Sequence, residues 1–162
     1  MRARWWHCLG LVPALGTAAL AAAGPTERFI FPISSQLMVP PTSSPAAGSA
    51  DLLLDVDTAS LHGFITFGSL RGTLTSVQIH GPASRTATGP LLFDLGPTRH
   101  VLLSELTHPQ LQELRQELWY LEVRTTVYPN GEERGQIVHA VTRVDAGTWG
   151  GVKALFRSSR RP

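Results

Sequence analysis

Between residues 28 and 144 the chain consists of short runs in which apolar and polar residues alternate. In residues 50–57 every even position is apolar, and three of the four odd positions carry Asp. A period of two puts successive side chains on opposite faces of a strand, so each run predicts a half-buried β-strand. The runs interpreted in this way are 28–33, 50–57, 61–67, 74–80, 90–95, 119–127 and 135–144.

Turn-forming residues separate these runs. Pro32 and the polar pair after Ile33 are expected to stop the first strand. Residues 40–48 and 83–89 are rich in Pro, Ser, Thr and Gly and are interpreted as loops. Asn130-Gly131 stands between two strand runs, which is a strong signal for a β-hairpin.

One segment has the period of a helix instead. Thr107 and Gln110 have the spacing of a capping box, and Pro109 lies in the first turn, where its missing N–H costs nothing. Leu111, Leu114 and Leu118 follow on one helical face. We therefore expect one short helix in an otherwise β-rich chain.

Strands that follow one another through short turns favour antiparallel pairing over βαβ units. The expected fold is mainly all-β: an antiparallel, Greek-key-like β-sandwich with one short helix, over residues 28–144. The length of 162 residues suits a single domain of ordinary size. Residues 145–162 are expected to form a flexible basic C-terminal tail.

The N-terminus has the three parts of a secretory signal peptide. Arg2 and Arg4 precede an apolar, Leu- and Ala-rich core, and the small residues 21–23 form the exit. A retained membrane anchor is the alternative, but Pro13 and Gly16 interrupt a segment already short for a span. We expect cleavage after residue 23, and a protein that is secreted or extracellular, or periplasmic in a bacterial source.

Removal of residues 1–23 changes the charge and cysteine content. The full chain has 14 Lys+Arg, 12 Asp+Glu and one Cys. Cleavage removes Arg2, Arg4 and the cysteine together with the signal peptide. The tail holds four of the remaining basic residues and Asp145. The domain itself is net acidic, which argues against a nucleic-acid partner, while the tail is expected to make weak contact with anionic surfaces.

No catalytic pattern is found in the mature sequence. It has no cysteine nucleophile, no Gly-x-Ser-x-Gly elbow and no phosphate-binding Gly-rich loop followed by Lys-Ser/Thr. Asp51, Asp55 and Asp57 alternate on one strand and lack the turn glycine and distal glutamate of a calcium loop. We expect no enzyme activity and no cofactor.

Four motifs in order resemble the CHRD domain, the repeated module of chordin that also occurs as single secreted copies. They are Val39-Pro40-Pro41 followed by Gly48-Ser49-Ala50, then Val77-Gln78-Ile79-His80-Gly81-Pro82, then Gly89-Pro90-Leu91-Leu92-Phe93-Asp94-Leu95, and last Pro129-Asn130-Gly131-Glu132-Glu133-Arg134-Gly135-Gln136-Ile137. The resemblance covers about Phe29 to Val144. It implies an extracellular β-sandwich of immunoglobulin-like or superoxide-dismutase-like form, with no established catalytic activity.

The resemblance also implies a position at which this chain departs from the family. Many members have His-x-His where this sequence has Gln78-Ile79-His80, and a later His where it has Arg124. Two imidazoles on one strand face suit a Cu or Zn site. Gln is a poor ligand for these metals and Arg stays protonated, so no metal site is expected here.

The candidate binding residues are the matched polar positions Gln78, His80, Arg124 and Arg134. Each also has an ordinary structural explanation. His80 beside a turn suits a hydrogen bond to the backbone, and Arg124 suits an ion pair with Glu122, Glu132 or Glu133.

Two main functions follow from these patterns, and a surface adhesin held to anionic polymers by the basic tail is kept as a third, lesser alternative. The first is a secreted, non-catalytic module that binds another extracellular protein or serves a structural role. The alternative is a metal-binding or redox protein of superoxide-dismutase-like form. Growth-factor antagonism does not carry over from chordin, because the cysteine-rich modules that bind the growth factors are missing from a mature chain without cysteine.

Overall fold

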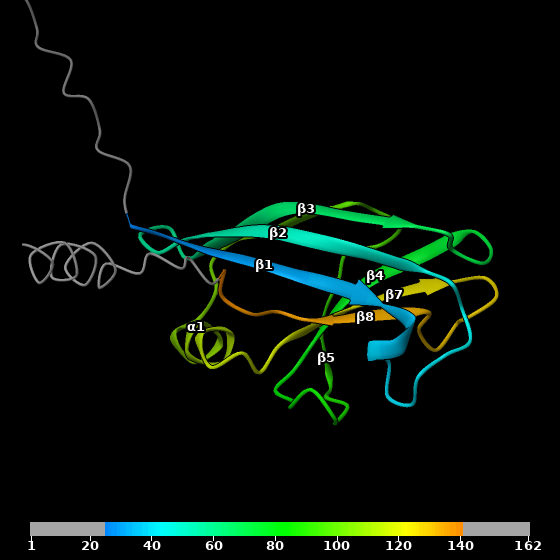
Figure 1. The fold of residues 1–162 in the computed structure, drawn as a ribbon. Coiled ribbons are helices and arrows are strands. Elements are labelled where there is room, and N and C mark those ends of the chain that lie inside the picture. Colours follow the sequence, from blue (N-terminus) through cyan, green and yellow to red (C-terminus); the bar gives the residue numbers. More distant parts are fainter. Residues whose placement is uncertain (1–24, 141–162) are drawn as a thin grey trace, which may run out of the picture.

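A computed structural model of the chain describes residues 25–140, in which eight strands form one antiparallel sheet (Figure 1). The strands are β1 (Thr26–Ser34), β2 (Ala47–Asp55), β3 (Ser60–Gly68), β4 (Leu74–His80), β5 (Leu91–Asp94), β6 (His100–Leu103), β7 (Tyr120–Thr125) and β8 (Glu133–Gln136). The described residues also contain a 3-10 turn, η1 (Ser35–Leu37), and one α-helix, α1 (His108–Arg115). The expected all-β fold with one short helix is confirmed.

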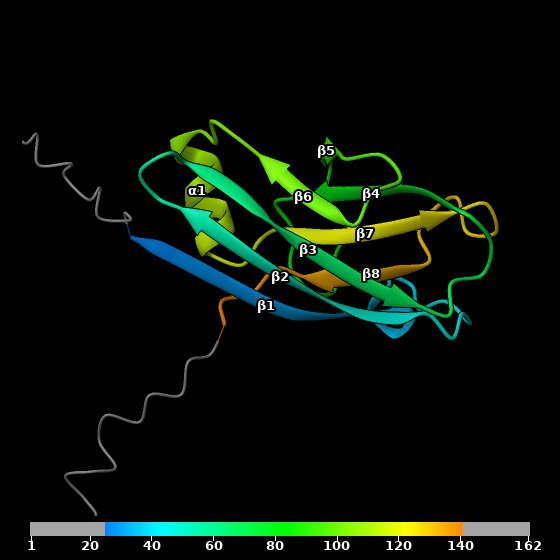
Figure 2. The same cartoon turned by 90° about the horizontal axis from the view of Figure 1, so that it is seen from above.

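The sheet bends where β8 meets β1. Its strand order is β5-β4-β7-β8-β1-β2-β3-β6, and within it β1 and β8 share a single residue pair, Ser34 with Arg134. The bend places β1, β2, β3 and β6, the upper half-sheet, over β4, β5, β7 and β8, the lower half-sheet (Figures 1 and 2). The sandwich is therefore made by one continuous sheet instead of two separate ones.

The core lies between the two half-sheets. Alternate residues of β1 and β2 point into it, including Phe29, Phe31 and Leu52, and they meet Ile79 and Leu121 from below. Trp119, just before β7, is fully buried in the same core. This alternation gives each half-sheet an outer face, and the two outer faces differ in their chemistry.

The first strand does not stop at Pro32, as the sequence suggested. Pro32 lies inside β1 and pairs with Ser49 of β2. A Cβ on Gly135 of β8 would collide with the Pro32 carbonyl oxygen, so this oxygen faces β8. The proline nitrogen points the same way, away from β2, and the β1–β2 ladder loses no hydrogen bond.

The helix begins as expected and ends early. Gln110 Oε1 accepts a hydrogen bond from the Thr107 backbone N–H at 2.8 Å, and Leu111 and Leu114 are buried. The prediction for Leu118 was wrong, because α1 ends at Arg115 and Glu117 has a positive φ of 58° that turns the chain toward β7.

Two further differences concern the strands: one strand was not predicted, and another ends early. β6 was not predicted, because only Val101 and Leu103 of its four residues point inward and Leu102 is exposed. The last strand was predicted as 135–144, but β8 ends at Gln136. Beyond it, the chain keeps an isolated bridge from His139 to Phe29.

The signal peptide predicted in residues 1–23, the end of the last predicted strand (141–144) and the tail predicted in residues 145–162 lie outside the described residues. Within residues 25–140, no helix is long and apolar enough to cross a membrane.

Candidate functional site: a polar cluster on the lower half-sheet

The outer face of the lower half-sheet is covered by polar side chains. Directly paired residues of antiparallel strands share a face. The register pairs Gln78 with Glu122, and Glu122 with Arg134, so these side chains meet across β4, β7 and β8. We call the group the polar cluster; its members are Ser76, Gln78, His80, Asp94, Tyr120, Glu122, Arg124, Arg134 and Gln136.

All four candidate residues from the sequence, Gln78, His80, Arg124 and Arg134, belong to this cluster. Only Arg124 keeps appreciable exposure, because loops cover the other three. Arg134 donates to the carbonyl oxygens of Ala87 at 2.8 Å and Ser84 at 3.0 Å, both in the loop between β4 and β5. The structure thus brings the candidates together beneath a loop, and their role in binding stays a prediction.

A chain of hydrogen bonds runs along β4. Asp94 accepts from Ser76 Oγ at 2.5 Å and from Gln78 Nε2 at 2.9 Å, and these bonds together with the Gly96 backbone N–H lower its pKa. Because the Gln78 nitrogen faces Asp94, its Oε1 faces His80 Nε2 at 3.1 Å. His80 Nδ1 lies 3.2 Å from the Gly89 carbonyl oxygen, which confirms the predicted bond to the backbone.

Tyr120 is the aromatic centre of the cluster. The His80 ring stacks on it with centroids 5.1 Å apart and planes 8° from parallel. The Arg134 guanidinium carbon lies 3.5 Å from the centroid of the same ring. Because β7 lies between β4 and β8, Tyr120 is held between an imidazole and a cation, an arrangement in which the ring face attracts the positive charge.

Arg124 has an ion pair, as the sequence predicted. Its Nε lies 2.7 Å from Glu122 Oε1, two residues earlier on the same strand face. The other two partners considered do not bond to Arg124: Glu132 bonds to other groups, and Glu133 points into the core. Glu122 also lies 4.0 Å from His80 Nε2.

Glu132 joins two loops to the end of β7 at the edge of the cluster. Its Oε1 accepts from Ser44 Oγ at 2.5 Å and from the Arg71 backbone N–H at 2.6 Å. Its Oε2 accepts from Thr125 Oγ1 at 2.6 Å. A fully buried carboxylate satisfied by three donors fixes these loops around the hairpin that precedes β8.

Glu133, the next residue, points to the opposite side. It pairs with Val123, whose side chain is in the core, and both of its carboxyl oxygens are buried without a hydrogen-bond partner. Burial, aided by the nearby charge of Glu132, raises the pKa of Glu133 to about 7.

Gln78, His80 and Arg124, the positions that the sequence analysis compared with a metal site, bond to other groups of the protein. Both ring nitrogens of His80 face oxygen atoms within hydrogen-bond distance. In residues 25–140, no three His, Cys, Asp or Glu side chains are grouped so that they could hold a metal ion.

The sequence analysis missed three members of this region. Tyr120 and Gln136 were not singled out, and Glu133 was considered only as a partner for Arg124. The period of two in residues 132–137 could have placed Arg134 and Gln136 on one face and Glu133 on the other. It could not show that loops bury the polar face.

Taken together, the bent antiparallel sheet and its loop-covered polar face define an all-β module. The chain belongs to the CHRD domain family, whose model matches residues 29–137. CHRD domains are modules of extracellular type. No solved structure matches the chain. Three of the motifs that carried the resemblance supply part of the polar cluster, from β4, β5 and β8, whereas β7, which lies outside the motifs, supplies Tyr120, Glu122 and Arg124.

Proposed function

We propose that this chain is a secreted, non-catalytic CHRD-domain protein that binds another extracellular protein. The binding surface in this proposal is the outer face of the upper half-sheet. One observation carries it: four large apolar side chains stand exposed on that single face, one from each strand.

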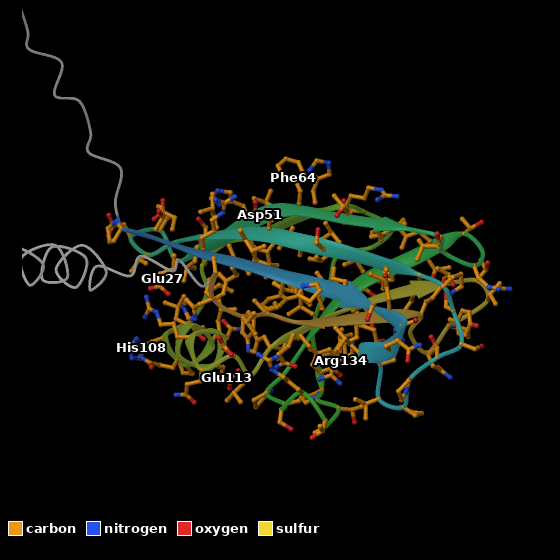
Figure 3. The ribbon with its side chains drawn as sticks, in the orientation of Figure 1. Glu27, Asp51, Phe64, His108, Glu113 and Arg134 are labelled. Atoms are coloured by element: carbon orange, nitrogen blue, oxygen red, sulfur yellow. The ribbon has the colours of Figure 1, made fainter. Side chains whose placement is uncertain are left out.

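The register places the four side chains in two adjacent rows. Ile30, Asp51, Phe64 and His100 form one row, and Arg28, Leu53, His62 and Leu102 form the next. The apolar members are exposed to 44% for Ile30, 37% for Leu53, 62% for Phe64 and 77% for Leu102. Figure 3 shows Phe64 and Asp51 on this face, far from Arg134. Contiguous exposed apolar side chains on a monomer are typical of protein-binding surfaces.

Charged groups on the same face indicate what kind of partner surface would complement it. Arg28 Nε donates to Asp51 Oδ1 at 2.9 Å, and both side chains are about half exposed. The surface therefore offers an apolar centre with one cation and one anion beside it. A protein surface with an exposed apolar side chain and charges of both signs complements it, whereas a highly charged polymer does not.

The polar cluster supports the non-catalytic part of the proposal. Its acids and bases bond to one another or to backbone oxygens, and most are covered by loops. A general acid or base needs access to a substrate proton, which these contacts oppose.

The test uses the purified protein as bait in its native extracellular fluid. We expect the double variant Phe64→Ser, Leu102→Ser to lose the captured protein, since exposed apolar anchors carry most of the energy of such contacts. Val127→Ser is the matched control, because Val127 is 56% exposed but lies after β7 on the lower half-sheet. Sedimentation of the bait alone identifies a second copy of the chain as the partner. Equal capture by the parent and the double variant would contradict the proposal.

A further inference from the structure

A small pocket lies at the edge of the polar cluster. Arg134, one of its lining residues, lies on the side of the molecule away from Phe64 (Figure 3). Its volume is about 110 Å³. Two arginines and a glutamine provide the polar part of its lining, and the rest is apolar. The lining residues are Pro32, Leu37, Arg85, Arg134, Gln136 and Val138.

Arg134, in the wall of this pocket, is a buried cation that has no carboxylate partner among residues 25–140. It is 2% exposed, and its hydrogen-bond acceptors are two backbone oxygens and Gln136 Oε1, all neutral. Arg28, Arg115 and Arg124, which are more exposed, each bond to a carboxylate. Glu122 attracts Arg134 from the neighbouring strand, but its Oε1 is bonded to Arg124.

Arg134 also has N–H donors that make no hydrogen bond to residues 25–140. A guanidinium has five N–H groups in a planar fork, and three hydrogen bonds to protein acceptors are made here. Arg85 adds a second cation at the pocket. Its side chain is 69% exposed and makes a loose contact with Glu117 at 3.6 Å, so it is free to turn toward a ligand.

The size and the walls of the pocket restrict what it can hold. Cavities of about 150 Å³ take a benzene ring, so this slightly smaller one takes a group of a few heavy atoms. Leu37, Val138 and Pro32 favour a short aliphatic segment next to the charged end. A carboxylate suits the two arginines, since its two oxygens match the guanidinium fork.

We propose that this pocket binds a carboxylate on a short aliphatic stem. The ligand is either a free short-chain acid or the end of a peptide, as an acidic side chain or a C-terminal carboxylate. The proposal does not depend on the function proposed above, because none of the four exposed apolar side chains of the upper half-sheet lines the pocket.

The experiment is a titration of the purified protein with butyrate, followed by NMR at the Arg134 side-chain Nε–H. Butyramide is the matched probe, with nearly the same shape and no charge. We expect saturable shifts with butyrate that weaken as salt is added, and at least about tenfold weaker binding of butyramide. Equal responses to the two probes, or no saturable shift with butyrate, would overturn the proposal.

Two variants test the location without removing the buried Arg134. Arg85→Gln takes away the exposed cation, and Leu37→Trp fills the pocket from a side chain that is 42% exposed. Each is expected to weaken butyrate binding severalfold. Arg28→Gln and Leu91→Trp are the matched controls at exposed sites elsewhere and should leave it unchanged. If both pocket variants bind butyrate as the parent does, the ligand is bound elsewhere and the proposal is wrong.

Peptide arms distinguish the sources of the carboxylate. One peptide has a free C-terminal carboxylate, its partner is amidated, and a third is amidated with an internal Glu. Tighter binding of the first or third than of butyrate assigns a peptide end or an acidic side chain, respectively. Butyrate as the tightest probe assigns a free acid.

Discussion

Glu132 and Glu133 are neighbours in the chain with opposite environments. Glu132 accepts hydrogen bonds from Ser44, Arg71 and Thr125, whereas Glu133 points into the core without a partner. An unpartnered buried carboxyl favours its neutral form, because burial penalises the charge. This difference predicts that Glu133 makes the free energy of unfolding depend on pH near neutrality.

We expect stability to fall as the pH rises from about 4.5 to 7. The pKa of Glu133 is raised from 4.5 to about 7 in the folded protein, so the folded state holds a proton that the unfolded state has lost in this window. This contribution to stability is complete below pH 4.5, and it is lost between pH 4.5 and pH 7, a decline of up to about 3 kcal/mol. The free energy of unfolding, measured by urea denaturation at pH values from 4.5 to 8, tests this prediction.

Glu133→Gln is the variant for this prediction, since it keeps the size of the side chain and cannot ionise. It should flatten the decline and be more stable than the parent at pH 8. Asp94 has a lowered pKa and therefore the opposite effect on stability. At acidic pH, stability is lost as the pH falls through the pKa of Asp94 in the folded protein. Parallel pH profiles for parent and variant would show that Glu133 is not the titrating group.

At the scale of elements, the hairpin between β7 and β8 holds the polar cluster against the loops. Gly131 has a positive φ of 111°, and a Cβ there would meet Met38 and the Glu122 side chain. The backbone conformation and the lack of space both require glycine at this position. The tight turn therefore also sets the distance between Met38 and β7.

Gly131→Ala is expected to destabilise the protein by about 2–4 kcal/mol, from backbone strain and from overpacking together. Gly96→Ala is the matched control. Its φ is also positive at 71°, but no atom lies within 4 Å of the added Cβ, so only strain of about 1 kcal/mol remains. Chemical denaturation measures both. Equal losses in the two variants would mean that the contacts with Met38 and Glu122 add nothing.

At the scale of the whole molecule, one sheet supplies two outer faces of different kinds. The upper face is open and partly apolar, and the lower face is polar and covered by loops. The bend at β8 and β1 separates them, because Gly135 lets the two backbones approach where a side chain would collide with Pro32. The molecule can thus present its apolar face and its carboxylate pocket to two different ligands.

Processing is a prediction about the whole chain. The basic start, the apolar core and the small residues 21–23 should direct export and cleavage, which leaves Gly24 as the first residue. The described strands begin two residues after this point, at Thr26. N-terminal sequencing of the exported protein measures this. An intact Met1 on most molecules would contradict it.

The sequence by itself determined the strand content, the helix start and the family. These properties depend on local patterns: a period of two, the Thr107–Gln110 capping box, and motifs of three to nine residues. It also brought Gln78, His80, Arg124 and Arg134 forward as a set. Their common face follows from strand periodicity once the pairing of β4, β7 and β8 is known.

Only the tertiary structure decided which faces are covered. The sequence could not show that loops bury the polar cluster, that Arg134 lacks a carboxylate, or that Glu133 faces the core. Pro32 in β1 and the exposed Leu102 in β6 misled local reasoning for the same cause. Their surroundings come from residues far away in the chain, and a pattern of neighbours carries no information about what packs against it.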